Sequence, residues 1–136
     1  MPTQNVPLTP LVGRRILLVE DARVNQLILT RWLRGWGAEV ICADTLAQAR
    51  SVLCSVPAFD GVLVDRHLPD GYGTELLPQL THCPHVLAMT MIDQDSDQLD
   101  LLAAGFDEVL PKPVDPIRLY AAFSDSDNRG MPSQSS

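Results

Sequence analysis

Short runs of apolar residues alternate along the chain with longer segments in which apolar residues recur every three or four positions. A short run that is apolar throughout is typical of a strand buried on both faces, and the three-to-four spacing is typical of an amphipathic helix. The predicted strands are residues 16–19, 39–42, 62–64, 86–89 and 108–110. The helical stripes lie within residues 24–32, 46–53, 73–80, 99–103 and 116–123, and the one at 73–80 is weak.

This alternation of strand and helix, repeated five times, predicts the fold class. Strands that are buried on both faces belong to a parallel sheet with helices on either side. Right-handed crossovers leave few ways of ordering such strands. The sequence therefore predicts an α/β fold, a flavodoxin-like (βα)5 three-layer sandwich whose parallel five-stranded sheet has the order 2-1-3-4-5.

Residues that favour helix ends flank several of these segments. Either Asp44 or Thr45 suits the N-cap of the second helix, and Gly105 suits the position just after the fourth helix. Asp115 suits the N-cap of the last helix, with Pro116 at its first helical position. These residues set the expected helix boundaries.

The length of 136 residues fits one domain. The first residues contain three prolines and no periodicity, and the last stretch contains one sizeable apolar residue, too few to offset the entropy of ordering it. We therefore expect a flexible leader at residues 1–13, the domain at 14–123 and a disordered tail at 124–136.

Charge and composition exclude some classes of function. A net charge of −7 makes direct binding to nucleic acid unexpected and favours a divalent cation or a basic partner surface. No apolar run approaches the roughly 18 residues of a membrane span. The three cysteines, Cys42, Cys54 and Cys83, have no metal-type spacing, so we expect no disulfide scaffold and a reducing, cytoplasmic location.

Polar side chains follow four of the five predicted strands directly. Glu20 and Asp21 follow the first strand, Asp65 the third, Thr90 the fourth and Lys112 the fifth. Because the carboxyl ends of parallel strands meet at one edge of a sheet, we expect these side chains to lie together. Each of these residues alone has an ordinary structural explanation, such as a helix N-cap for the adjacent acids. The prediction of a site therefore depends on their meeting at one edge of the sheet.

Such a cluster suits phosphoryl chemistry. Three carboxylates at close range repel one another and need a cation, and carboxylate oxygens suit Mg²⁺. An aspartate beside such a metal can attack phosphorus and become an aspartyl phosphate. If Asp65 carries the phosphoryl group, then Lys112, Mg²⁺ and the Thr90 hydroxyl are available to contact its oxygens.

At this point the sequence resembles a response-regulator receiver domain, in the style of those in hybrid sensor histidine kinases. The intervals between its motifs also agree with that family. The motifs are I-L-L-V-E-D at residues 16–21, L-V-D-R-H-L-P-D-G-Y-G at 63–73, M-T at 89–90 and L-P-K-P at 110–113. The resemblance implies a phosphoacceptor domain of a two-component or phosphorelay system, with no enzymatic activity beyond self-catalysed phosphotransfer and autodephosphorylation.

The resemblance also implies roles and partners. Asp65 would accept a phosphoryl group from a phosphohistidine of a histidine kinase or phosphotransfer domain. Glu20, Asp21, Asp65 and the backbone carbonyl of His67 would hold Mg²⁺. A homodimer through the face of the fourth and fifth helices is a further implication, with no direct contact to nucleic acid or membrane.

Lys112 would contact the phosphoryl oxygens, and Thr90 would move towards them and carry the switch. The peptide bond between Lys112 and Pro113 would be cis, since cis bonds are essentially a feature of proline.

The sequence departs from the family pattern at Val109, where an aromatic residue is usual, and at Met91, where a small residue is usual. These departures keep open a second interpretation, a protein-interaction module with a receiver fold that does not need phosphorylation. A third interpretation is an enzyme, either a phosphatase with an aspartate nucleophile or a flavin protein. The residues after the first strand match neither enzyme.

Overall fold

The structure is a computed structural model that describes residues 10–56, 58–91 and 95–124. Its centre is a parallel sheet with the order β2-β1-β3-β6-β7, which confirms the predicted order 2-1-3-4-5. A separate two-stranded antiparallel hairpin follows β3. The strands of the sheet are β1 (Arg15–Val19), β2 (Glu39–Ala43), β3 (Gly61–Asp65), β6 (His85–Met91) and β7 (Glu108–Lys112).

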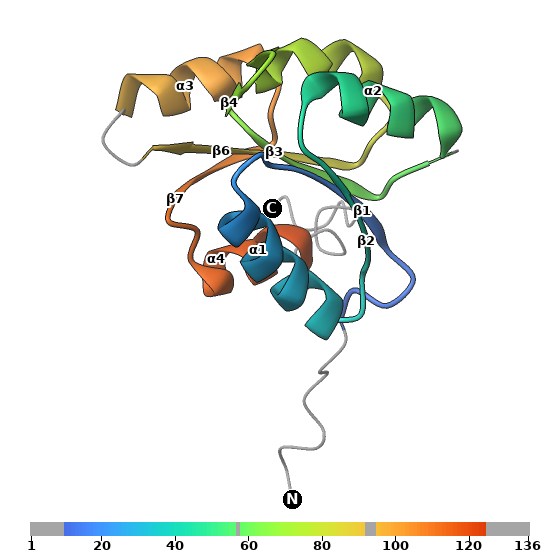
Figure 1. Ribbon diagram of the computed structural model, residues 1–136. Coiled ribbons are helices and arrows are strands. Elements are labelled where there is room, and N and C mark those ends of the chain that lie inside the picture. The colour runs from blue at the N-terminus through green and yellow to red at the C-terminus, as the bar shows by residue number, and fades with distance from the viewer. Residues whose placement is uncertain (1–9, 57, 92–94, 125–136) are drawn as a thin grey trace, which may run out of the picture.

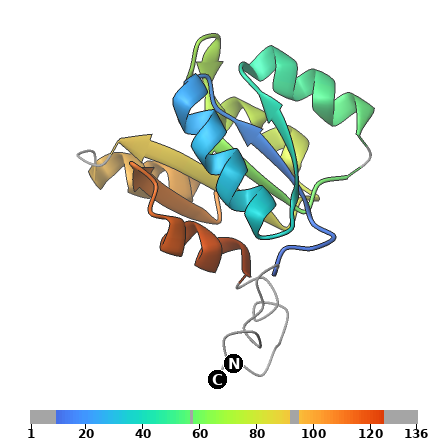
Figure 2. The ribbon, with the colours of Figure 1, turned by 60° about the horizontal axis from the view of Figure 1, so that its bottom comes forward.

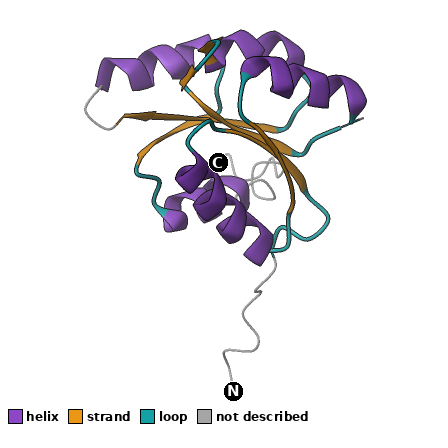
Figure 3. Cartoon of the chain, in the orientation of Figure 1, coloured by secondary structure: helices purple, strands orange, loops and turns teal. Residues whose placement is uncertain are grey.

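Helices cover both faces of this sheet (Figures 1 and 3). The helices are α1 (Arg23–Gly35), α2 (Leu46–Ser55), the 3-10 helix η2 (Gly73–Leu80), α3 (Asp95–Ala104) and α4 (Pro116–Ser124). The helices α1 and α4 lie side by side on one face (Figure 2), where Trp36 at the end of α1 meets the ring of Tyr120 edge-on. The other three lie on the opposite face, so the molecule has the expected three layers.

Each face of the sheet has its own apolar core, because successive strand residues point to opposite sides. Leu17, Val62 and Val64 are buried against α2, η2 and α3, whereas Leu18 and Leu63 are buried against α1 and α4. All five residues of β3 are buried, as its position in the middle of the sheet requires. Packing on both faces therefore holds the carboxyl ends of the strands in place, where the predicted polar residues lie.

Two details differ from the sequence prediction. The weak third helix is a 3-10 helix, which contains Pro78; proline lacks the N–H that an α-helical hydrogen bond would use. Leu11 was assigned to the leader, yet it is fully buried in the core beside α1, and its N–H donates to the carbonyl of Trp36. Ser124, the first residue of the predicted tail, is the last residue of α4. Residues 1–9 of the predicted leader and the predicted tail from residue 125 lie outside the described residues.

The expected helix ends are confirmed. Thr45 caps α2 by accepting a hydrogen bond from the N–H of Gln48 at 3.1 Å, and Asp115 accepts one from the N–H of Ile117 at 2.9 Å. Gly105 adopts a φ of 128° just after α3, a conformation that favours glycine.

Candidate functional site

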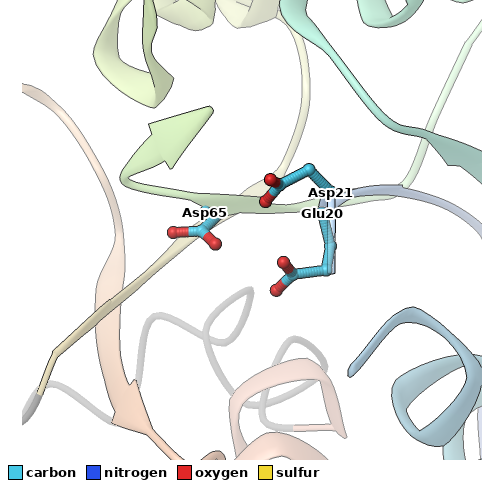
Figure 4. Close-up of side chains that lie close together, drawn as sticks. All are labelled: Glu20, Asp21 and Asp65. Atoms are coloured by element: carbon cyan, nitrogen blue, oxygen red, sulfur yellow. The ribbon is translucent and has the colours of Figure 1, made fainter. Parts of the chain in front are cut away.

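The structure brings the three predicted acids together at the carboxyl edge of the sheet. Glu20 and Asp21 follow β1, and Asp65 is the last residue of β3, its neighbour. Figure 4 shows the three side chains gathered in one place, and one oxygen of each lies within 4.8 Å of the others. Glu20 and Asp65 are buried, and Asp21 is exposed. The cluster therefore has two enclosed carboxylates and one that faces solvent.

Lys112, the last residue of β7, reaches the same cluster. Its Nζ lies 2.5 Å from Oδ2 of Asp65 and 3.1 Å from Oε1 of Glu20. It is the single lysine of the chain. The peptide bond between Lys112 and Pro113 is cis, as predicted. One ammonium group therefore faces two buried carboxylates, which leaves the cluster with an excess of negative charge.

The oxygens of Glu20 are unequally satisfied. Oε2 accepts a hydrogen bond from the N–H of Ala22 at 2.9 Å. Oε1 is buried, and Nζ of Lys112 lies 3.1 Å from it as an ion-pair partner. Burying a carboxylate is costly unless its charge is compensated, and Lys112 is shared between Glu20 and Asp65. With two further carboxylates nearby, this donor set fits a hard divalent cation such as Mg²⁺.

The pKa shifts in the cluster follow from burial and charge. Burial raises the pKa of Glu20 above its ordinary value of 4.5, and the nearby charge of Asp65 raises it further, against the opposing effects of Ala22 and Lys112. Burial alone would lower the pKa of Lys112, but the hydrogen bonds and charges of Asp65 and Glu20 outweigh it, so that pKa is raised. Lys112 therefore stays charged at neutral pH.

A second layer of hydrogen bonds holds Glu20 in place, and the sequence interpretation missed it. The buried Gln26 of α1 donates from Nε2 to the backbone carbonyl of Glu20 at 2.9 Å and to Oδ1 of Asp44 at 2.8 Å. Asp44 follows β2, the strand to which sequence reasoning assigned no site residue. The edge of β2 therefore contributes support to the cluster.

The chain beyond Asp65 turns back on itself as a hairpin of β4 (His67–Leu68) and β5 (Gly71–Tyr72). The N–H of His67 donates to Oδ1 of Asp65 at 3.2 Å. At the end of the hairpin, a Cβ on Gly73 would lie 2.5 Å from the carbonyl oxygen of Asp65, so only glycine fits there. The hairpin is thus packed directly against the backbone of Asp65.

The other predicted residues lie around this edge with different exposure. Thr90 is buried and follows Met89, the residue of β6 paired with Asp65. Met91 ends β6 opposite Lys112, and its side chain is largely exposed. Val109 is buried in the core on the α3 side of the sheet. The position that is usually aromatic in receivers is therefore filled here by a small core residue.

Comparison with known proteins agrees with this geometry. A sequence model of the response regulator receiver domain matches residues 16–124. The chain belongs to this family. Receiver domains are signalling domains of two-component and phosphorelay systems, and this one is related to the receivers of hybrid histidine kinases. In the described part of this receiver domain, no helix has the length and apolar character needed to cross a membrane.

Curated relatives of the receiver domain include far longer proteins. The sensor protein TorS of Escherichia coli is 32% identical over 75% of this chain and 12% of TorS. Probable histidine kinase 6 of Oryza sativa is 28% identical over 84% of this chain and 14% of the kinase. The chain therefore spans a small fraction of the length of these relatives.

Solved structures of similar size have the same fold. A two-component response regulator from Clostridium difficile superposes with a TM-score of 0.78 and 27% identity, covering 86% of this chain and 98% of that one. The receiver domain of a sensor histidine kinase from Pseudomonas aeruginosa has a TM-score of 0.72 and 28% identity, covering 86% and 99%. The latter structure has a magnesium ion coordinated in its active-site cleft.

Proposed function

We propose that this receiver domain takes a phosphoryl group from a phosphohistidine onto Asp65. The observation that carries the proposal is the cluster of Glu20, Asp21 and Asp65 with its single ammonium group from Lys112. In this proposal the three carboxylates and the backbone carbonyl of His67 hold Mg²⁺. When bound, Mg²⁺ supplies positive charge that offsets the negative charge of the phosphoryl oxygens.

The remaining steps fall to the side chains of the domain. An oxygen of Asp65 attacks phosphorus, so that a P–O bond forms as the P–N bond to the donor imidazole breaks and its electron pair returns to the ring. Lys112 already contacts Asp65 and is placed to contact an oxygen of the incoming group. The phosphoryl group brings a charge of about −2, and the Thr90 hydroxyl is the proposed partner that moves towards it and signals its presence. Later hydrolysis by water would return Asp65 to its starting state.

A module that needs no phosphorylation is the less favoured function. Burial of the carboxylates of Glu20 and Asp65 beside one lysine costs solvation free energy. A protein that binds partners through its surface alone gains nothing from that cost. Val109 and Met91 therefore bear on how the signal is transmitted and not on whether the phosphoryl group is accepted.

Incubation with acetyl phosphate and Mg²⁺ tests the proposal. The intact protein is expected to gain the mass of one phosphoryl group, and chelation of the metal with EDTA is expected to prevent the gain, because the acidic cluster then repels the anionic donor. Intact-protein mass spectrometry makes the measurement. If the mass stays unchanged over a range of donor and Mg²⁺ concentrations, the phosphoacceptor proposal is wrong.

A histidine kinase or histidine phosphotransfer domain is the proposed phosphodonor, and α1 offers a surface for it. Val24, Leu27 and Ile28 are 67%, 58% and 42% exposed on this helix. Ile28 also lines a pocket with Glu20 and Lys112, which places the apolar surface beside the site. An exposed apolar patch next to a reactive group is typical of a docking surface for the protein that delivers the reactant.

Replacement of Leu27 by glutamate is therefore expected to slow transfer from a phosphorylated histidine phosphotransfer protein about tenfold or more, because a charge would be buried in the contact. Transfer from acetyl phosphate, which needs no docking surface, should keep its rate. Val12→Glu is the matched control, since Val12 is 64% exposed and precedes β1, at the end of that strand opposite Glu20. Equal slowing by both variants, or none by Leu27→Glu, would contradict docking on α1.

Two further parts of the proposal concern assembly and location. Leu99 and Leu102 of α3 and Ile117 of α4 are exposed apolar residues. Their two helices both contact the edge strand β7, and these residues support a homodimer through that edge of the molecule. A cytoplasmic location is proposed as well, because phosphohistidine donors are made there with ATP and the three cysteines are free.

A further inference from the structure

The carboxylate of Asp70 ties the hairpin after Asp65 to the first turn of α2, although the two segments are far apart in sequence. We infer that Asp70 is a positioning residue for the metal site. Its two hydrogen bonds to α2 hold the hairpin, and the hairpin sets the orientation of the backbone N–H and carbonyl of His67. The inference rests on the proposed function, since it concerns the Mg²⁺ site of that function.

The contact itself is bidentate. Oδ1 of Asp70 accepts a hydrogen bond from the N–H of Leu46 at 2.8 Å, and Oδ2 accepts one from the N–H of Ala47 at 3.0 Å. These hydrogen bonds, the one from Leu46 first, lower the pKa of Asp70 below its ordinary value of 3.8 despite partial desolvation. α2 already has its own cap in Thr45, which binds the next N–H along, that of Gln48. Asp70 therefore adds an anchor for the hairpin to a helix that begins without it.

The residue after Asp70 packs closely against α2 as well. Gly71 has a φ of 152°, and a Cβ there would lie 2.7 Å from Cδ1 of the buried Leu46 and 2.6 Å from Oε2 of Glu75. The same Glu75 oxygen accepts a hydrogen bond from the N–H of Tyr72 at 3.0 Å. The hairpin thus lies directly against the side chain of Leu46, the first residue of α2.

The hairpin transmits this position to Asp65. Its strands pair His67 with Tyr72 and Leu68 with Gly71, so only Pro69 and Asp70 form the turn. The N–H of His67 contacts Oδ1 of Asp65, and the carbonyl of His67 is the proposed fourth ligand. The contact of Asp70 with α2 therefore restrains the N–H and the carbonyl of His67 through the short paired strands of the hairpin.

The start of α2 also supports the other half of the site. The N–H of Asp44, just before the helix, donates to Oε1 of Gln48 at 2.5 Å. Asp44 in turn holds Gln26, which holds the carbonyl of Glu20. The two loops that carry the metal-binding carboxylates are thus fixed to the same helical turn, and groups that orient ligands in this way commonly tune metal affinity.

Magnesium titration of the whole chain tests the inference. Trp32 lines the pocket beside Glu20 and Lys112, so tryptophan fluorescence is a suitable readout. Asp70→Ala is expected to raise the Kd for Mg²⁺ about three- to tenfold, less than the loss of a direct partner of a ligand, because Asp70 acts through the backbone and is exposed. Asp70→Asn, which retains one of the two acceptors, should give an intermediate Kd. The phosphorylation rate with acetyl phosphate at saturating Mg²⁺ should stay near that of the unaltered chain.

Asp60→Ala is the matched control, because Asp60 likewise accepts a hydrogen bond from a distant backbone N–H, that of Arg15 at 2.7 Å, but at the amino end of β1, opposite the acidic cluster. It is expected to lower the stability of the protein but to leave the Kd for Mg²⁺ unchanged. If Asp70→Ala also leaves the Kd unchanged, or if Asp60→Ala raises it equally, the positioning role is wrong while the proposed function stands. If the unaltered chain shows no Mg²⁺ binding, the proposed function fails and this inference fails with it.

Discussion

Replacement of Asp65 by asparagine is expected to abolish covalent phosphorylation by acetyl phosphate. An amide oxygen is a far weaker nucleophile than a carboxylate, so no acyl phosphate forms at this position. The variant also removes one of the three carboxylates that are close enough to share a cation. Intact-protein mass spectrometry after incubation with donor and Mg²⁺ is expected to show complete loss of the mass gain.

Asp100→Asn is the control for this experiment. Asp100 is an exposed carboxylate on α3 that is not part of the cluster, and its replacement should leave the mass gain unchanged. Near-ultraviolet circular dichroism should show that both variants are folded. An undiminished gain in Asp65→Asn would assign the phosphoryl group to another residue, and Glu20 and Asp21 would be the first to test.

Replacement of Lys112 by methionine is expected to produce the largest loss of stability among the site variants. Lys112 is the cation that contacts the two buried carboxylates of Glu20 and Asp65, whose side chains are 0% and 10% exposed. Removal of one partner of a buried ion pair typically costs about 3–5 kcal/mol, because the remaining charge is left uncompensated. Urea unfolding at pH 7 without Mg²⁺ measures the change.

The pH dependence of this loss has a definite sign. In the unaltered chain the raised pKa of Lys112 contributes stability that is present below its ordinary value of 10.5 and lost as the pH rises through the folded-state pKa. In Lys112→Met, Glu20 loses the hydrogen bond and the positive charge of Lys112, which both lower its pKa, so the pKa of Glu20 rises further. The cost of burying the charged Glu20 is relieved as the pH falls through this raised pKa and is absent below 4.5. The stability deficit should therefore shrink on acidification from pH 7.

Two comparisons separate this explanation from a general loss of a cation. Arg118→Met breaks an exposed ion pair with Glu108, 3.7 Å apart, and should cost at most about 1 kcal/mol. Saturating Mg²⁺ should stabilise Lys112→Met, because the metal supplies positive charge to the same oxygens. A deficit in Lys112→Met no larger than that of Arg118→Met would contradict the view that Lys112 compensates the buried carboxylates.

The sheet and the main cluster could be predicted from the sequence because both follow from local patterns. Uniformly apolar runs identify strands buried on both faces, and the residues after such strands must meet at one edge. Glu20, Asp21, Asp65 and Lys112 are therefore brought together by strand order alone, which is confirmed. The helix ends at Thr45 and Asp115 were also predictable, because capping depends on adjacent residues.

The supporting contacts were not predictable in this way. The strands β4 and β5 have two residues each, which is too short for an alternating pattern to be recognised. The contacts of Asp70 with α2 and of Gln26 with Asp44 join residues 24, 23 and 18 positions apart, and nothing in the residue types specifies the partner. The burial of Leu11 was not predictable either, because this residue lies among prolines and packs against a core that exists only after folding.

Because Lys112 is the single lysine of the sequence, the site is easy to observe in isolation. A sample grown with isotopically labelled lysine as the sole labelled residue would place its only side-chain ammonium signal, within these 136 residues, between Glu20 and Asp65. Its NMR resonance would respond to the arrival of a metal ion or an acyl phosphate without any need for resonance assignment. The same nucleus would thus follow ion binding, phosphorylation and dephosphorylation in real time.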